Sequence, residues 1–133
     1  MHPLRDRRQR RALERWDHRR TLVFDERAPH AHRLTCLVHD LTDTRRLADF
    51  ARIASDVITS NTPTVILDLR RVHDADSKLV SMLVQLARRA RAYDVRMRVF
   101  PSESLESWFA VCRVEKFFRP SPDAEFPTHH LAS

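Results

Sequence analysis

The sequence contains no glycine among its 133 residues. Glycine adopts positive φ angles without steric cost, so a turn that needs such an angle must use another residue, and asparagine or aspartate tolerates it best. The absence also excludes the glycine-rich loops that cradle phosphates in nucleotide-binding enzymes. Asn61 lies between a predicted helix and Pro63, and we expect it to take the left-handed turn that glycine would otherwise supply.

Cysteines are few, and long apolar runs are absent. The sequence has two cysteines, Cys36 and Cys112, which is fewer than a secreted disulfide framework normally uses. Neither cysteine has the spaced Cys or His partners of a zinc site. Both fall in apolar patterns, which predicts packed free thiols. No apolar run reaches the roughly 18 to 20 residues of a membrane span, and no signal peptide is recognisable. We therefore expect a cytoplasmic protein.

The formal net charge of +6 is concentrated at one end of the sequence. Residues 1–20 carry eight arginines against three acidic residues, a balance of +5, and the rest of the chain contributes +1. Such dense like charge predicts a basic arm, disordered or loosely helical, outside the core. Binding of RNA, DNA or an anionic membrane through this arm is an alternative, although Trp16 is its only aromatic residue.

Hydrophobic periodicity divides the rest of the chain into alternating strands and helices. The predicted strands are 21–26, 33–41, 64–69 and 95–100, and the predicted helices follow Thr42–Asp43–Thr44, span 78–93, and follow Pro101–Ser102. The pair Phe117–Phe118 forms either a short edge strand or part of the core. Residues 120–133 form a proline-containing tail. This order predicts an α/β fold, with helices packed against a mixed, mainly parallel sheet of four to five strands.

The helix predicted at 78–93 has an apolar face that points to the core and a polar face that points to solvent. At about 100° per residue, its apolar positions from Leu79 to Tyr93 fall on one side. Ser81 and Arg88 lie away from that side. Val84 lies between them, and core packing does not account for it.

The run that carries a family resemblance is TVILDLRRVHDADSKLVSMLVQLARRARAYDVRMRVFPSESLESWFAVCRVEKFF. It resembles a STAS domain (sulfate transporter and anti-sigma factor antagonist). The family pattern is a strand ending in Asp-Leu, here Asp68–Leu69, and a short loop with Asp-Ser, here Asp76–Ser77. A long helix, a strand, a final helix and an apolar pair then follow. With the preceding strand and helix, the resemblance covers residues 21–119.

The resemblance implies a non-enzymatic regulatory module. Stand-alone members of the family bind anti-sigma factor kinases, and phosphorylation of the serine that matches Ser77 releases the partner. The sequence departs from the family pattern at the start and at the end of the long helix. Lys78 and Leu79 replace a small residue and a glycine, which adds bulk and charge where a partner would approach. Asp94 replaces the glycine expected at the end of the second helix, a position that aspartate tolerates.

Ser77 therefore has two interpretations, which are compatible. It is a helix N-cap worth about 1 kcal/mol, or it is a phosphoacceptor whose phosphate would meet the positive end of a helix dipole. The resemblance places a partner-binding surface on the loop and the following helix. Its predicted residues are Asp76, Ser77, Lys78, Ser81, Val84 and Arg88.

Other functions have weaker support in the sequence. A phosphorylation-independent scaffold or a small-ligand-binding module on the same fold is the main alternative, favoured by Lys78 in place of a small residue. Asp74 and Asp76 next to His73 could suggest acid–base or metal chemistry, but a third ligand at useful spacing is missing, so a polar loop is predicted. We expect no catalytic residues, metal or cofactor. The expected partner is an anti-sigma factor, a serine kinase or a signalling scaffold, and the oligomeric state is left open.

Overall fold

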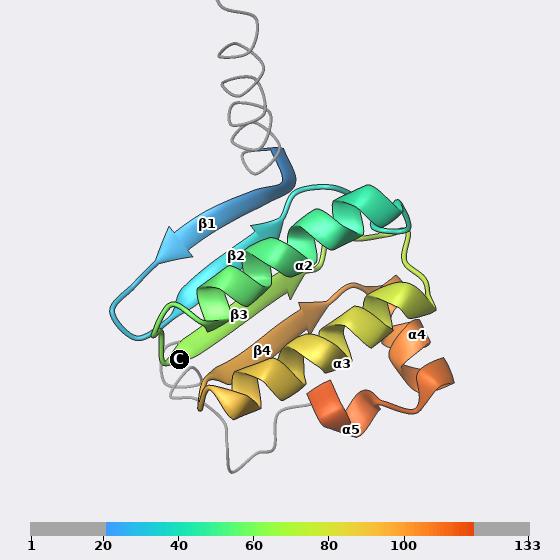
Figure 1. Cartoon of the computed structure of the whole chain (residues 1–133). Coiled ribbons are helices and arrows are strands. Elements are labelled where there is room, and N and C mark those ends of the chain that lie inside the picture. The colour runs from blue at the N-terminus through green and yellow to red at the C-terminus, as the bar shows by residue number, and fades with distance from the viewer. Residues whose placement is uncertain (1–20, 119–133) are drawn as a thin grey trace, which may run out of the picture.

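A computed structural model describes residues 21–118 as a four-stranded sheet with helices. In chain order the elements are β1 (Val23–Arg27), β2 (His32–Cys36), α2 (Thr44–Ile58), β3 (Thr64–Leu69), α3 (Ser77–Ala92), β4 (Arg96–Pro101), α4 (Glu103–Cys112) and α5 (Glu115–Phe118). The strands lie in the order β1-β2-β3-β4 (Figure 1). The first pair is antiparallel and the other two are parallel, which confirms the predicted mixed, mainly parallel sheet.

The second strand is shorter than predicted. It ends at Cys36, whereas the alternating pattern continues to Leu41. Beyond Cys36 the chain leaves the sheet, and Leu41 turns into the core with no exposed surface. Leu41 is thus buried by a loop and not by continued strand pairing, and Leu37 and Val38 are half-buried.

The helix α2 begins and ends where its capping residues predict. The Asp43 carboxylate accepts hydrogen bonds from the backbone N–H groups of Arg45 and Arg46, at 2.9 and 3.1 Å. These bonds satisfy donors that the first turn of a helix leaves unpaired. After the helix, Asn61 has a φ of 67°, so the predicted left-handed turn without glycine is confirmed. Asp94 has a φ of 56° after α3 and serves the same purpose.

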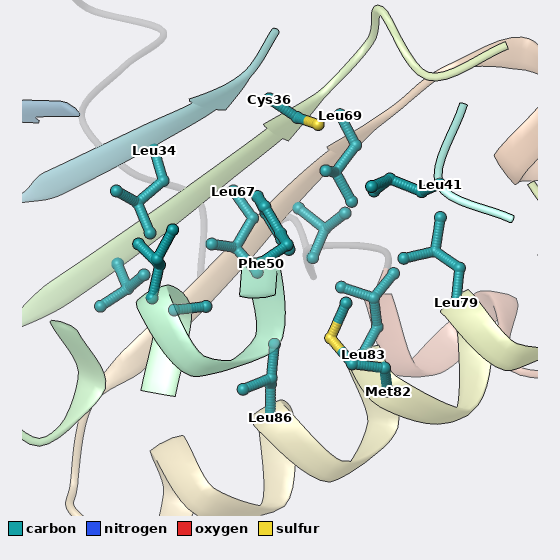
Figure 2. Packing of buried hydrophobic residues seen from close by; sticks show 14 of the residues in the cluster. Leu34, Cys36, Leu41, Phe50, Leu67, Leu69, Leu79, Met82, Leu83 and Leu86 are labelled. Carbon is teal, nitrogen blue, oxygen red and sulfur yellow. The ribbon is translucent and has the colours of Figure 1, made fainter. Parts of the chain in front are cut away.

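The core lies between one face of the sheet and the helices α2 and α3. Figure 1 shows these two helices side by side across the strands. Phe50 of α2 and Leu83 of α3 are fully buried, as is Leu67 of β3, and Figure 2 shows them among the packed side chains. Burying a side chain of this size contributes about 1.5–3 kcal/mol, so this layer provides much of the stability.

One residue predicted for the core face of α3 lies outside it. Tyr93 is 52% exposed because the helix ends at Ala92, and Tyr93 is its C-cap with φ −97° and ψ 8°. The Arg89 guanidinium lies over the Tyr93 ring at 5.6 Å. Val84, which the core pattern left unexplained, is half-buried.

The last described elements are two helices. Ser102 caps α4 by accepting the Leu105 N–H. Residues 115–118 form the short helix α5, so the alternative of an edge strand is wrong. Phe118 stacks on the buried Phe109 with ring centroids 4.7 Å apart, whereas Phe117 is half exposed. One of the two rings therefore packs on the core.

Two predicted segments, the arm at 1–20 and the tail at 120–133, lie outside the described residues. Within residues 21–118, the helices are too short or too polar to cross a bilayer.

Candidate functional site

Two loops lie side by side at the carboxyl ends of the parallel strands β2 and β3. They are the β2–α2 loop (residues 37–43) and the β3–α3 loop (residues 70–76). Asp40 and Asp74 form an isolated parallel bridge, and the Leu41 N–H donates to the Asp74 carbonyl at 3.0 Å. The His39 carbonyl accepts the N–H groups of His73 and Asp74, both at 2.9 Å. Carboxyl ends of parallel strands are where open α/β sheets usually bind ligands.

Side chains add further links between these loops and the rest of the fold. The buried Ser102 hydroxyl, from the start of α4, donates to the Val72 carbonyl at 2.6 Å. The rings of His39 and His73 stack with centroids 5.1 Å apart. His39 Nδ1 also lies 3.0 Å from the Arg71 carbonyl oxygen. The β3–α3 loop is thus held from both sides, and it presents the following helix in a fixed position.

The residue that caps α3 is Asp76, which corrects the prediction that Ser77 does so. Asp76 has the extended backbone of an N-cap, and its carboxylate accepts the Lys78 N–H at 2.9 Å. Ser77 is the first residue of the helix and is exposed. Within residues 21–118, its hydroxyl has no hydrogen-bond partner. The cap therefore leaves the Ser77 hydroxyl available at the surface.

Lys78 bridges the start of α3 to the β2–α2 loop. Its Nζ lies 3.4 Å from the Thr42 carbonyl oxygen and 3.7 Å from the Asp76 carboxylate. The side chain is 53% exposed, so this ion pair is solvated and contributes little to stability. The bridge places a positive charge beside Ser77.

The predicted binding residues of α3 lie on one stripe of the helix. Ser77, Ser81, Val84 and Arg88 are spaced four, three and four residues apart, which places them on one side at 3.6 residues per turn. Ser77, Ser81 and Arg88 are exposed, and Val84 is half-buried. The structure thus brings together all of the predicted residues, with Asp76 and Lys78 at one end of the stripe.

Sequence reasoning missed the part of this surface that comes from the β2–α2 loop. His39 and Thr42 lie beside the β3–α3 loop although more than thirty positions separate them from His73 and Lys78. The available signal was that both loops follow parallel strands, because the carboxyl ends of such strands share one edge of the sheet.

The carboxylates near the site are not arranged for metal binding within the described residues. Asp76 serves as the helix cap, and Asp74 is exposed. Among residues 21–118 no three His, Cys, Asp or Glu side chains gather in a group that could hold a metal ion. The buried Cys36 thiol has its pKa raised to about 11 by burial, which makes it a poor nucleophile.

Asp68 is a buried structural carboxylate near the end of β3. Arg33 and Arg70 donate to it at 2.5 and 2.8 Å. Burial raises its pKa, but the hydrogen bonds from Arg70 and Arg33 outweigh burial and hold the pKa of Asp68 well below its usual range. The carboxylate therefore ties β2 to the start of the β3–α3 loop.

Comparison with known proteins identifies the fold. No protein-family model and no curated protein sequence matches the chain. The solved structure of the anti-sigma factor antagonist SpoIIAA in its unphosphorylated form is similar, with a TM-score of 0.62. The match covers 81% of this chain and 96% of that chain, at 14% sequence identity. The described part of the chain thus has a STAS-like fold, which confirms the resemblance drawn from the sequence.

Proposed function

We propose that this chain is a non-enzymatic regulatory module that binds a protein partner at the Ser77 corner (Asp76, Ser77 and Lys78) and the α3 outer face (Ser81, Val84 and Arg88). The partner is an anti-sigma factor or a serine kinase, and phosphorylation of Ser77 switches binding. The observation that carries the proposal is the exposed Ser77 hydroxyl, which no described residue engages because Asp76 provides the cap.

The chemistry of the corner supports a switch that leaves the fold intact. A phosphate on Ser77 adds about −1.5 to −2 charges at neutral pH. The positive end of the α3 dipole and the Lys78 ammonium favour this charge, while Asp76 opposes it. Asp76 already occupies the Lys78 N–H, so the phosphate is directed toward solvent, where it changes the surface that a partner meets.

A binding experiment with the full-length protein tests the proposal. Partners captured from cells of the native host are identified by mass spectrometry, and the affinity of the captured partner is measured for wild type, Ser77→Asp and Ser77→Ala. Ser107→Asp is the matched control, because Ser107 is an exposed serine on α4 that belongs to neither the Ser77 corner nor the α3 outer face. We expect Ser77→Asp to weaken binding at least tenfold and Ser107→Asp to leave it unchanged.

Phosphorylation itself is tested by incubating the protein with the captured kinase and ATP, followed by mass mapping of the modified residue. An unmodified Ser77 together with an unchanged affinity of Ser77→Asp would refute the switch.

A phosphorylation-independent scaffold is the second candidate, and Lys78 is the observation that favours it. The Lys78 side chain reaches the Thr42 carbonyl and adds bulk beside Ser77. This candidate predicts that phosphatase treatment leaves the captured set of partners unchanged. It also predicts that Lys78→Ser alters partner affinity more than Ser77→Ala does.

A further inference from the structure

A groove runs along the edge of the sheet formed by β4. It has a volume of about 550 Å³ and is lined by β4, α4 and α5. Consecutive strand residues face opposite sides of a sheet, yet Arg98, Val99 and Phe100 all line this groove. Val99 is only 6% exposed. These residues meet one cavity because the cavity follows the strand's backbone edge. We call it the edge groove.

The backbone at this edge has hydrogen-bonding groups directed outward. The Arg96 N–H donates to the Pro63 carbonyl at 3.0 Å, at the start of the β3–β4 pairing. Backbone amides alternate in direction along a strand, so the N–H groups of Met97 and Val99 point away from β3. Within the described sheet β4 is the last strand. The edge groove therefore offers a segment of chain both a cavity and backbone partners.

The opposite wall of the edge groove is acidic and its floor is aromatic. Glu103, Glu106 and Glu115 line it from α4 and α5, and all three are exposed. Arg98 of β4 is the basic residue of the lining, so the groove as a whole stays acidic. The stacked rings of Phe109 and Phe118 form its apolar part. A segment with arginines and a few apolar residues matches both features, because guanidinium groups pair with carboxylates and also stack on aromatic rings.

We propose that the edge groove binds the arginine-rich segment at residues 1–20 of the same chain. This segment carries a net charge of +5, opposite to the acidic wall, and Leu4 and Leu13 are apolar residues suited to the floor. The segment joins the domain just before β1, at the edge of the sheet opposite β4. Three strand spacings, about 14 Å, separate the two edges, and the eight residues from Leu13 to Thr21 can span up to about 26 Å. Covalent linkage gives an effective concentration in the millimolar range, so weak contacts suffice.

Other occupants fit the edge groove less well. Residues 119–133 contain three prolines, which lack the N–H needed to pair with a strand edge, and Asp123 and Glu125 would meet the acidic wall. A second copy is not covalently linked, so it lacks the millimolar effective concentration that favours residues 1–20.

Limited trypsin digestion of the full-length protein tests this proposal, because trypsin cleaves after arginine and residues 1–20 contain eight. The cleavage rate within 1–20 is followed by intact mass. The groove variant is Glu103→Gln/Glu106→Gln/Glu115→Gln. The control variant, Glu26→Gln/Asp56→Asn/Asp94→Asn, makes the same change in net charge at exposed positions outside the groove. Circular dichroism confirms that each variant is folded.

We expect the groove variant to be cleaved about 2- to 10-fold faster than wild type, as for a tethered segment bound half to nine-tenths of the time. The control variant should match wild type. Salt at about 0.5 M, which screens charges beyond a few ångströms, should raise the wild-type rate to that of the groove variant without any substitution.

Three results would overturn the proposal. The first is that wild type and the groove variant are cleaved at equal rates at low salt and that salt does not change the wild-type cleavage rate. In that case residues 1–20 do not occupy the groove. Equal acceleration in the control variant means that net charge alone governs cleavage. A wild-type rate that falls as the protein concentration rises means that the segment comes from a second copy.

Discussion

Replacing Asp76 and Ser77 separately by alanine distinguishes which of the two caps α3. Asp76→Ala removes the acceptor of the Lys78 N–H at 2.9 Å, which costs about 1 kcal/mol, with a range of about 0.5–2. Loss of the solvated ion pair with Lys78 adds at most about 0.5 kcal/mol. Ser77→Ala removes a hydroxyl without a described partner, and alanine is the better helix former by about 0.5 kcal/mol. The two variants should therefore differ by about 1.5–2 kcal/mol.

Urea unfolding followed by far-UV circular dichroism measures both variants on the full-length protein. We expect Asp76→Ala to lower the free energy of unfolding and the melting temperature, by about 4–8 °C per kcal/mol for a domain of roughly 100 residues. Ser77→Ala should be as stable as wild type or slightly more so, with an unchanged m-value. If Ser77→Ala is destabilised as much as Asp76→Ala, then Ser77 is the cap and its hydroxyl is not available to a kinase.

Three further predictions concern the rest of the fold. Asp68→Asn should lower the free energy of unfolding at pH 7 by about 2 kcal/mol, which chemical unfolding would measure. Arg33 and Arg70 lose a buried charged partner, but both arginine side chains are partly exposed to water, which limits the loss. The folded-state pKa of Asp68 is depressed below the unfolded value of about 3.9, so this difference should be full above about pH 5 and shrink as pH falls below 4; a constant difference would contradict the linkage. Arg113→Gly should raise the free energy of unfolding by about 1 kcal/mol, because Arg113 has a φ of 58° and glycine adopts this angle without steric cost. Arg113→Ala should give no such gain, and the melting temperatures of the two variants would show the difference.

Much of the fold follows from patterns that are local in the sequence. The strand at 64–69 has the predicted bounds because a run that is apolar on both faces is typical of a central parallel strand. The cap of α2 lies within the predicted stretch Thr42–Asp43–Thr44, although only the structure selects Asp43. The turn at Asn61 follows because asparagine tolerates the left-handed conformation and Pro63 ends the helix. Tyr93 was misplaced because helical periodicity gives the direction of a side chain but not the residue at which the helix ends.

The candidate site was predicted less completely, for two physical reasons. Asp76 and Ser77 are both good capping residues, and only the backbone angles, φ −144° and ψ −173° at Asp76, decide between them. The contribution of His39 and Thr42 depends on how β2 and β3 pair. Periodicity assigns each strand but does not fix which residues of two distant strands lie opposite each other.

The connectivity of the sheet has a consequence for how quickly the chain folds. Within the described sheet, only β1 and β2 are joined by a short turn and able to pair on their own. The central strand β3 pairs on both sides across a helix, so each of these pairings requires a loop of about thirty residues to close first. Contacts so distant in sequence slow folding from microseconds toward milliseconds or longer. We expect the rate-limiting barrier to involve β3 meeting its neighbours, with the β1–β2 hairpin contributing little to it.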